Sequence, residues 1–70
     1  MRKQTTNEEL LQYCNDLNKY GLVVEFLSRM GKYEIEVNGV TYRDGLSKRE
    51  CGNILHAMRF MAMVMSEGEE

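Results

Sequence analysis

The start of the chain shows apolar residues at helical spacing behind a polar segment. Thr6 and Glu9 stand three positions apart, as in a capping box, where each side chain pairs with the other residue's backbone N–H. Apolar residues then recur at the spacing of one helix face: Leu10, Leu11, Cys14 and Leu17. Gly21 suits the position after a helix end, so we predict a helix from the Thr6 cap to about Tyr20.

The pattern then changes to that of β-strands. Residues 22–29 are rich in β-branched and aromatic side chains, residues 32–37 alternate between apolar and polar, and residues 40–43 form a third short run. Asn38-Gly39 is a preferred dipeptide of two-residue type I′ hairpin turns, and Met30-Gly31 leaves a gap of the same length. We therefore predict three antiparallel strands.

The two turns predict which residues face each other across the sheet. The expected pairs are Val24 with Val37, Phe26 with Ile35, Val37 with Val40, and Ile35 with Tyr42. Apolar side chains then share one face, which consists of Leu22, Val24, Phe26, Tyr33, Ile35, Val37, Val40 and Tyr42. This face requires a cover, and the helices supply it.

A second capping box, Ser47 with Glu50, begins a helix that we predict from Lys48 to about Ser66, with Leu46 and Cys51 placed for a hydrophobic staple. Its expected inward stripe consists of Cys51, Leu55, Met58, Ala62 and Met65. The fold class is α+β, an α-β-β-β-α two-layer open sandwich with a three-stranded antiparallel sheet and both helices on one face. We expect a single domain over residues 1–70, with residues 1–5 and 67–70 frayed.

The most unusual stretch is residues 57–65, which is apolar nearly all round the predicted helix and is interrupted only by Arg59. A helix in a two-layer domain buries a single stripe, which leaves Phe60, Met63 and Val64 in excess. These residues either bind a second copy or another protein, or pack against the first helix. The candidate protein interface consists of Phe60, Met63, Val64, Arg59, and Val23 and Leu27 on the outer sheet face.

Composition and residue spacing argue against a nucleic-acid-binding protein, a metal-binding protein and an enzyme. Nine basic and eleven acidic residues among 70 give a formal charge of −2, without the basic excess usual in nucleic-acid-binding modules. Cys14 and Cys51 fall on apolar helical positions, where we expect core residues, and His56 has no partners with metal-ligand spacing. Gly52, early in the second helix, indicates close approach of that helix to the sheet. We expect no enzymatic activity, metal or cofactor.

Location and partners follow from the same features. The sequence contains no apolar run of membrane-spanning length, and its first residues lack a signal-peptide pattern, so we expect a cytoplasmic protein without membrane contact. The expected partner is a target protein or a second copy in a homodimer.

Two families offer resemblances. The α-β-β-β-α order, with Ser47, Lys48 and Arg49 at the last helix start, resembles the double-stranded-RNA-binding domain. That resemblance implies that Lys48 and Arg49 contact phosphates, and it provides the alternative hypothesis.

The whole chain, including the segment from Leu46 to Glu50, also looks like the small orphan proteins of bacteriophages and mobile elements. This likeness implies a stoichiometric inhibitor of a host protein, such as a CRISPR nuclease or another defence protein, acting in the host cytoplasm. It is the leading hypothesis.

Overall fold

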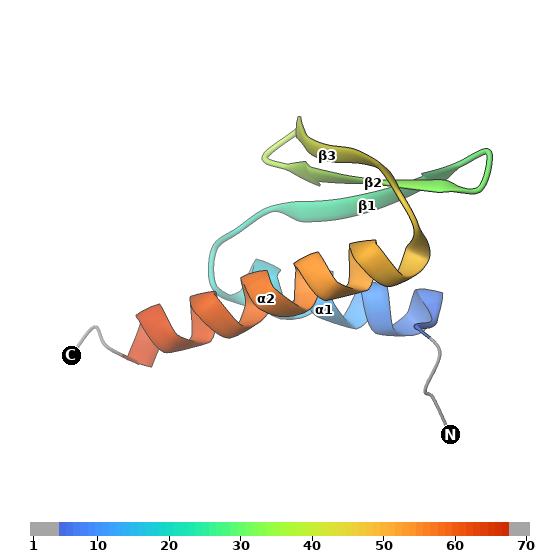
Figure 1. Cartoon of the computed structure of the whole chain (residues 1–70). Helices are drawn as coiled ribbons and strands as arrows, with labels where there is room; N and C mark the ends of the chain where they lie inside the picture. The colour runs from blue at the N-terminus through green and yellow to red at the C-terminus, as the bar shows by residue number, and fades with distance from the viewer. Residues whose placement is uncertain (1–4, 68–70) are drawn as a thin grey trace, which may run out of the picture.

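The computed structural model describes residues 5–67, which form two helices and a three-stranded sheet (Figure 1). In chain order the elements are α1 (Asn7–Lys19), β1 (Val24–Arg29), β2 (Lys32–Val37), β3 (Val40–Leu46) and α2 (Lys48–Glu67). The strands lie in the order β1-β2-β3 and both neighbouring pairs are antiparallel. The helices cover one face of the sheet, α1 against β1, and α2 against β2 and β3. The α+β two-layer fold is therefore confirmed.

Side-chain caps fix where the helices begin. Thr6 Oγ1 accepts a hydrogen bond from the Glu9 backbone N–H at 3.2 Å, so Thr6 caps α1. At the start of α2, the Glu50 N–H donates to Ser47 Oγ at 3.1 Å and the Ser47 N–H donates to Glu50 Oε1 at 2.9 Å. This reciprocal pair confirms the second capping box, and it fixes the direction in which α2 leaves the sheet.

The end of α1 is fixed by backbone geometry. Gly21 has a φ of +89°, and the Leu22 N–H beyond it donates to the Leu17 carbonyl oxygen at 3.2 Å. A left-handed residue directly after a helix is the usual stop signal, because it turns the chain away while the last carbonyls remain bonded. The chain crosses at this point to β1, which begins at Val24, two residues later than predicted.

The strand register agrees with the prediction in the first hairpin and departs from it in the second. Val24 faces Val37 and Phe26 faces Ile35, and Val37 faces Val40 as expected. Ile35, however, faces Arg43 instead of Tyr42, because the register shifts beside it.

The irregular pairing changes the inner face at β3. Two residues of β3, Asp44 and Gly45, lie between the partners of Tyr33 and Ile35, and Gly45 has a φ of +65°. Such a bulge bends the strand and lets β3 continue to Leu46, beyond the predicted end at residue 43. The prediction that Val40 and Tyr42 complete the covered face is wrong, because both side chains are exposed.

The core lies between the two helices and the first two strands. Its buried members are Leu10, Cys14, Leu17, Val24, Tyr33, Ile35, Cys51 and Leu55. Met58 and Ala62 pack partly buried against this cluster, as predicted for the inward stripe of α2. Met65 does not, since 67% of its surface is exposed. Met65 is exposed because α2 is longer than the sheet, so its last turns extend beyond the strands (Figure 1).

Gly52 makes a close contact, but not with the sheet. A Cβ at this position would lie 2.9 Å from Thr5 Cγ2 and 3.6 Å from Leu10 Cδ2, so the glycine admits the segment that leads into α1. The expected approach to the sheet is therefore wrong. Of the residues predicted to fray, Thr5 lies beside Gly52 of α2 and Glu67 is the last residue of that helix. The other residues expected to fray, 1–4 and 68–70, lie outside the described part of the chain.

Candidate functional site

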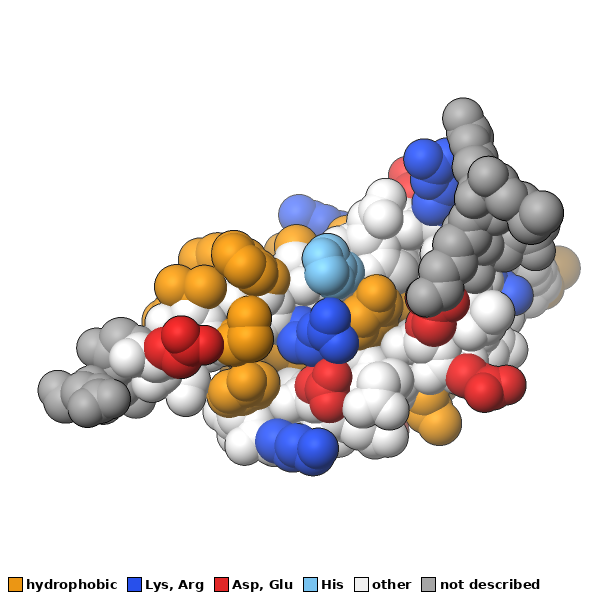
Figure 2. All heavy atoms as spheres, turned by 90° about the horizontal axis from the view of Figure 1, so that it is seen from below, with side chains coloured by type: hydrophobic (Ala, Val, Ile, Leu, Met, Phe, Trp, Pro, Cys, Tyr) orange, Lys and Arg blue, Asp and Glu red, His pale blue; other side chains and the backbone are white. Residues whose placement is uncertain are grey.

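The C-terminal half of α2 exposes more large apolar side chains than a water-facing helix needs. The exposed members are Phe60, Met61, Met63, Val64 and Met65, which we call the α2 apolar segment. Figure 2 shows hydrophobic side chains gathered toward the end of the molecule where the C-terminus lies. Contiguous exposed apolar surface is uncommon in monomeric proteins and marks interaction sites.

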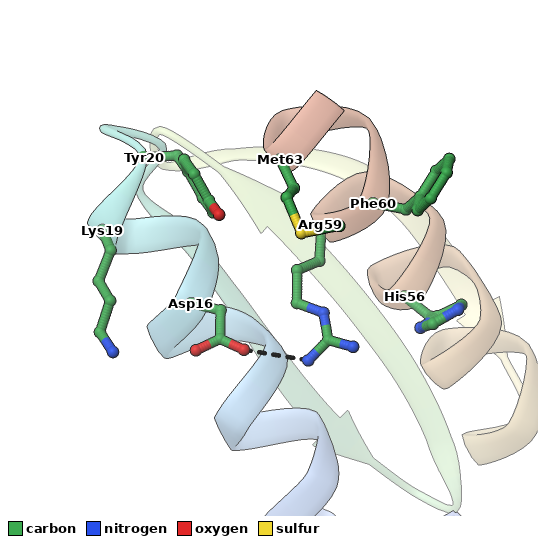
Figure 3. Close-up of a pocket in the computed structure, with 7 residues that line it drawn as sticks. All are labelled: Asp16, Lys19, Tyr20, His56, Arg59, Phe60 and Met63. Atoms are coloured by element: carbon green, nitrogen blue, oxygen red, sulfur yellow. Dashed lines mark hydrogen bonds and ion pairs between the residues drawn. The ribbon is translucent and has the colours of Figure 1, made fainter. Parts of the chain in front are cut away.

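On one side of this segment, a cleft of about 570 Å³ separates the end of α1 from α2 (Figure 3). We call it the α1–α2 cleft, and its lining consists of Asp16, Lys19, Tyr20, His56, Arg59, Phe60 and Met63. Tyr20 and Met63 supply apolar surface from the two walls, while Phe60 stands at the outer edge of α2. The cleft thus combines aromatic and sulfur-containing side chains with charged groups of both signs.

An ion pair joins the two walls of the cleft. Arg59 Nη1 donates to Asp16 Oδ2 at 3.0 Å, and the Gln12 amide donates to the other carboxylate oxygen at 2.9 Å. These hydrogen bonds, with the Arg59 bond the larger cause, hold the pKa of Asp16 below its usual value. The Arg59 guanidinium also lies 4.7 Å from the Tyr13 ring centroid. Arg59 is consequently held in place between the helices.

The two cysteines do not line this cleft, whereas His56 does. The thiols of Cys14 and Cys51 are buried in the core, and burial raises the pKa of each to about 11. His56 is exposed, with its ring centroid 5.7 Å from that of Tyr13. Within residues 5–67, no three acidic, histidine or cysteine side chains lie close enough to hold a metal ion.

A second hollow lies on the opposite side of α2. This β3–α2 groove has a volume of about 490 Å³ and is lined by Leu22, Tyr42, Arg43, Ile54, Ala57, Met58, Met61, Ala62 and Met65. The groove was not predicted from the sequence, for two reasons. Tyr42 and Met65 were predicted to be core residues. The apolar repeat along α2 through Ile54 and Met61 was visible in the sequence but was not interpreted as a surface.

The predicted interface residues occupy two separate faces. Phe60, Met63 and Arg59 line the α1–α2 cleft together, and Val64 is exposed on the same stretch of α2 outside that lining. Val23 and Leu27 are also exposed, but they alternate with the inward residues Val24 and Phe26. They therefore lie on the outer face of the sheet, which separates them from the α2 apolar segment.

Lys48 and Arg49, the residues of the nucleic-acid alternative, are exposed in the first turn of α2. The Lys48 ammonium lies 6.0 Å from the Tyr33 ring centroid, and the capping carboxylate of Glu50 follows in the same turn. This position is at the opposite end of α2 from the apolar segment, so the two candidate surfaces do not overlap.

Comparisons with known proteins add no family to this description. No protein-family model, curated protein or solved structure matches the chain. The case for a function therefore depends on the surfaces themselves. Membrane insertion has no support in residues 5–67, because neither helix combines the length and apolarity of a bilayer span.

Proposed function

We propose that the protein is a small non-enzymatic binding module that acts by stoichiometric contact with another protein through the α1–α2 cleft and the adjoining surface of α2. One observation carries the proposal: Phe60 is 54% exposed on a helix whose inward residues Cys51 and Leu55 are fully buried. An exposed phenylalanine next to exposed Met63 and Val64 forgoes hydrophobic stabilisation that a partner would provide.

The composition of the cleft supports a protein as the partner. Aromatic residues, methionine and arginine are enriched where proteins bind each other, and the cleft contains Tyr20, Phe60, Met63 and Arg59. Methionine side chains adapt their shape to a partner, which suits a surface without deep, rigid pockets. The ion pair between Arg59 and Asp16 orders the cleft before binding, which lowers the entropy cost of association.

The same proposal includes the class of protein that is bound. The likeness to small phage-type proteins favours a host protein as the target, with inhibition as the result of occupying its working surface. A chain of 70 residues that offers a ready-made binding face is well suited to such blocking. A CRISPR nuclease or another defence protein is the class of target that this likeness implies.

Affinity capture tests the proposal. The purified chain is immobilised and exposed to an extract of the cells in which its gene is expressed, and bound proteins are identified and quantified by mass spectrometry. We expect one protein to be retained at about one copy per chain, and Phe60→Lys with Met63→Lys to weaken its binding at least about 30-fold, as loss of a binding hot spot does.

Leu11→Lys is the matched control, because Leu11 is 56% exposed on α1 and lies outside the cleft lining. This variant places the same charge on a similarly exposed apolar position and should bind the target like the wild type. Retention of the target by the Phe60/Met63 variant, or equal loss in the Leu11 variant, would contradict the proposal.

A further inference from the structure

We infer that the β3–α2 groove is occupied by a second copy of this chain, whose α2 packs antiparallel along the first. This surface lies on the other side of α2 from the cleft proposed for the target. The inference therefore goes beyond the proposed function: the dimer would present two target-binding faces at once.

The spacing of apolar residues along the groove is that of a helix pair. Four residues of α2 that line it, Ile54, Met58, Met61 and Met65, are separated by intervals of four, three and four. This is the heptad repeat with which two helices interlock along a shared seam. On the cleft side, the corresponding series includes His56 and Glu67, so it is not apolar throughout. Only the groove side offers an uninterrupted seam across three turns.

The same spacing fits a two-fold axis. The intervals of four, three and four read identically in both directions along α2. When two such helices run antiparallel, Ile54 of one copy faces Met65 of the other, and Met58 faces Met61. A symmetric dimer requires a surface that is complementary to itself in this way. The groove beside each seam, with Tyr42 on its far wall, then receives the ridge of the opposite helix.

The groove supplies most of the apolar area that a small dimer needs. Tyr42, Met61 and Met65 are 48%, 54% and 67% exposed, and side chains of this size then offer about 100 Å² each. The partly buried Leu22, Ile54 and Met58 add to these roughly 300 Å² on each copy. A standard interface buries about 600–1,000 Å² per partner, about two-thirds of it apolar in homodimers, which corresponds to about 400–650 Å².

Charge distribution favours a second copy here and a different protein at the cleft. Among the described residues that line the groove, Arg43 alone is charged, and its guanidinium already lies 4.6 Å from the Tyr42 ring centroid. The cleft has charged Asp16, Lys19 and Arg59 in its lining. Homodimer interfaces are apolar and poor in charge, since buried charges are costly, whereas more polar surfaces suit exchangeable partners.

Sedimentation velocity over a range of protein concentrations tests the inference. We expect the wild type to sediment as a dimer at about 100 µM. Met61→Lys with Met65→Lys should weaken dimerisation at least about 30-fold, because two lysines then face the seam of the other copy. Phe60→Lys with Met63→Lys is the control, since both positions lie on the cleft side, and it should remain dimeric.

Circular dichroism establishes that each variant retains its helices. If the Met61/Met65 variant loses them, Met65→Lys alone takes its place, because Met65 lies beyond the sheet and its replacement should also weaken the dimer at least about tenfold. A wild type that is monomeric at about 100 µM, a folded seam variant that stays dimeric, or dissociation in the Phe60/Met63 control would overturn the inference. The monomeric seam variant should still capture the target, which separates failure of the dimer from failure of the proposed function.

Discussion

Cys14 and Cys51 show how burial decides the chemistry of a side chain. Both thiols belong to the core between the two helices, and burial is the main cause that raises the pKa of each to about 11. A thiol needs ionisation to act as a nucleophile or a metal ligand, so at neutral pH these two remain inert core residues. Their identification as core residues from apolar helical spacing agrees with this burial.

The raised thiol pKa values predict a pH dependence of stability. In the unfolded chain a cysteine ionises with a pKa of about 9.0, whereas the folded thiols hold their protons to about 11. The free energy of unfolding should therefore fall as the pH rises from about 9 towards 11, since the unfolded chain then releases protons that the folded chain keeps. Urea unfolding at several pH values measures this slope.

Cys14→Ala with Cys51→Ala serves as the comparison for that experiment. The variant loses core packing at every pH, but its free energy of unfolding should fall less steeply above pH 9, because it lacks the two thiols that ionise more readily in the unfolded chain. Identical slopes in the two proteins would show that the thiols are not buried as the structure places them.

Residue burial was predictable from the sequence only where regular geometry holds. Alternation placed Val24 and Ile35 inside correctly, since they lie in the hairpin with unbroken register. It failed for Tyr42, because strand alternation assumes continuous pairing and the register shifts along β3. Val40 pairs with Val37 as predicted and is nevertheless exposed. The prediction failed for Met65 because helical periodicity says nothing about how far the sheet extends. These failures depend on tertiary structure, which local patterns do not encode.

At the level of elements, the two hairpin turns share a conformation but not a sequence. Asn38 and Met30 both have positive φ, +55° and +51°, and each precedes a glycine with positive φ. Asparagine tolerates this left-handed region, whereas methionine meets steric conflict there. Met30 is 95% exposed, so no packing compensates for the strain.

This comparison predicts a stabilising substitution. Met30→Asn should raise the free energy of unfolding by about 1 kcal/mol, because asparagine relieves the backbone conflict without loss of a core contact. Asn38→Met is the matched control at the equivalent turn position and should lower it by a similar amount. Chemical denaturation of both variants measures the two changes, and a less stable Met30→Asn protein would refute the strain argument.

Both helix starts and the end of α1 were the most predictable part of the fold. The caps at Thr6 and Ser47 and the stop at Gly21 were all visible, because each depends on a few residues adjacent in sequence. The candidate surface was predictable in part: the excess of apolar residues indicated Phe60 and Met63. The β3–α2 groove was not, because one wall comes from Tyr42 at a bulge that the pattern does not reveal.

At the scale of the whole molecule, the main feature is that α2 is longer than the layer it belongs to. Its first half contributes Cys51 and Leu55 to the buried core, and its last turns extend past the sheet (Figure 1). Its second half also exposes several large apolar side chains. A domain of this size has little stability in reserve, and exposed apolar surface invites association. One side of this half of α2 is the proposed surface for a target protein, and the other is the proposed surface for a second copy.

Urea unfolding at one protein concentration distinguishes an end of α2 that binds partners from one that belongs to the chain's own core. Leu55→Ala should lower the free energy of unfolding by about 2–5 kcal/mol, because Leu55 is fully buried. Phe60→Lys with Met63→Lys should change it by less than about 1 kcal/mol, since both side chains are exposed. A loss in the double variant as large as that of Leu55→Ala would contradict the account, because Phe60 and Met63 would then belong to the core.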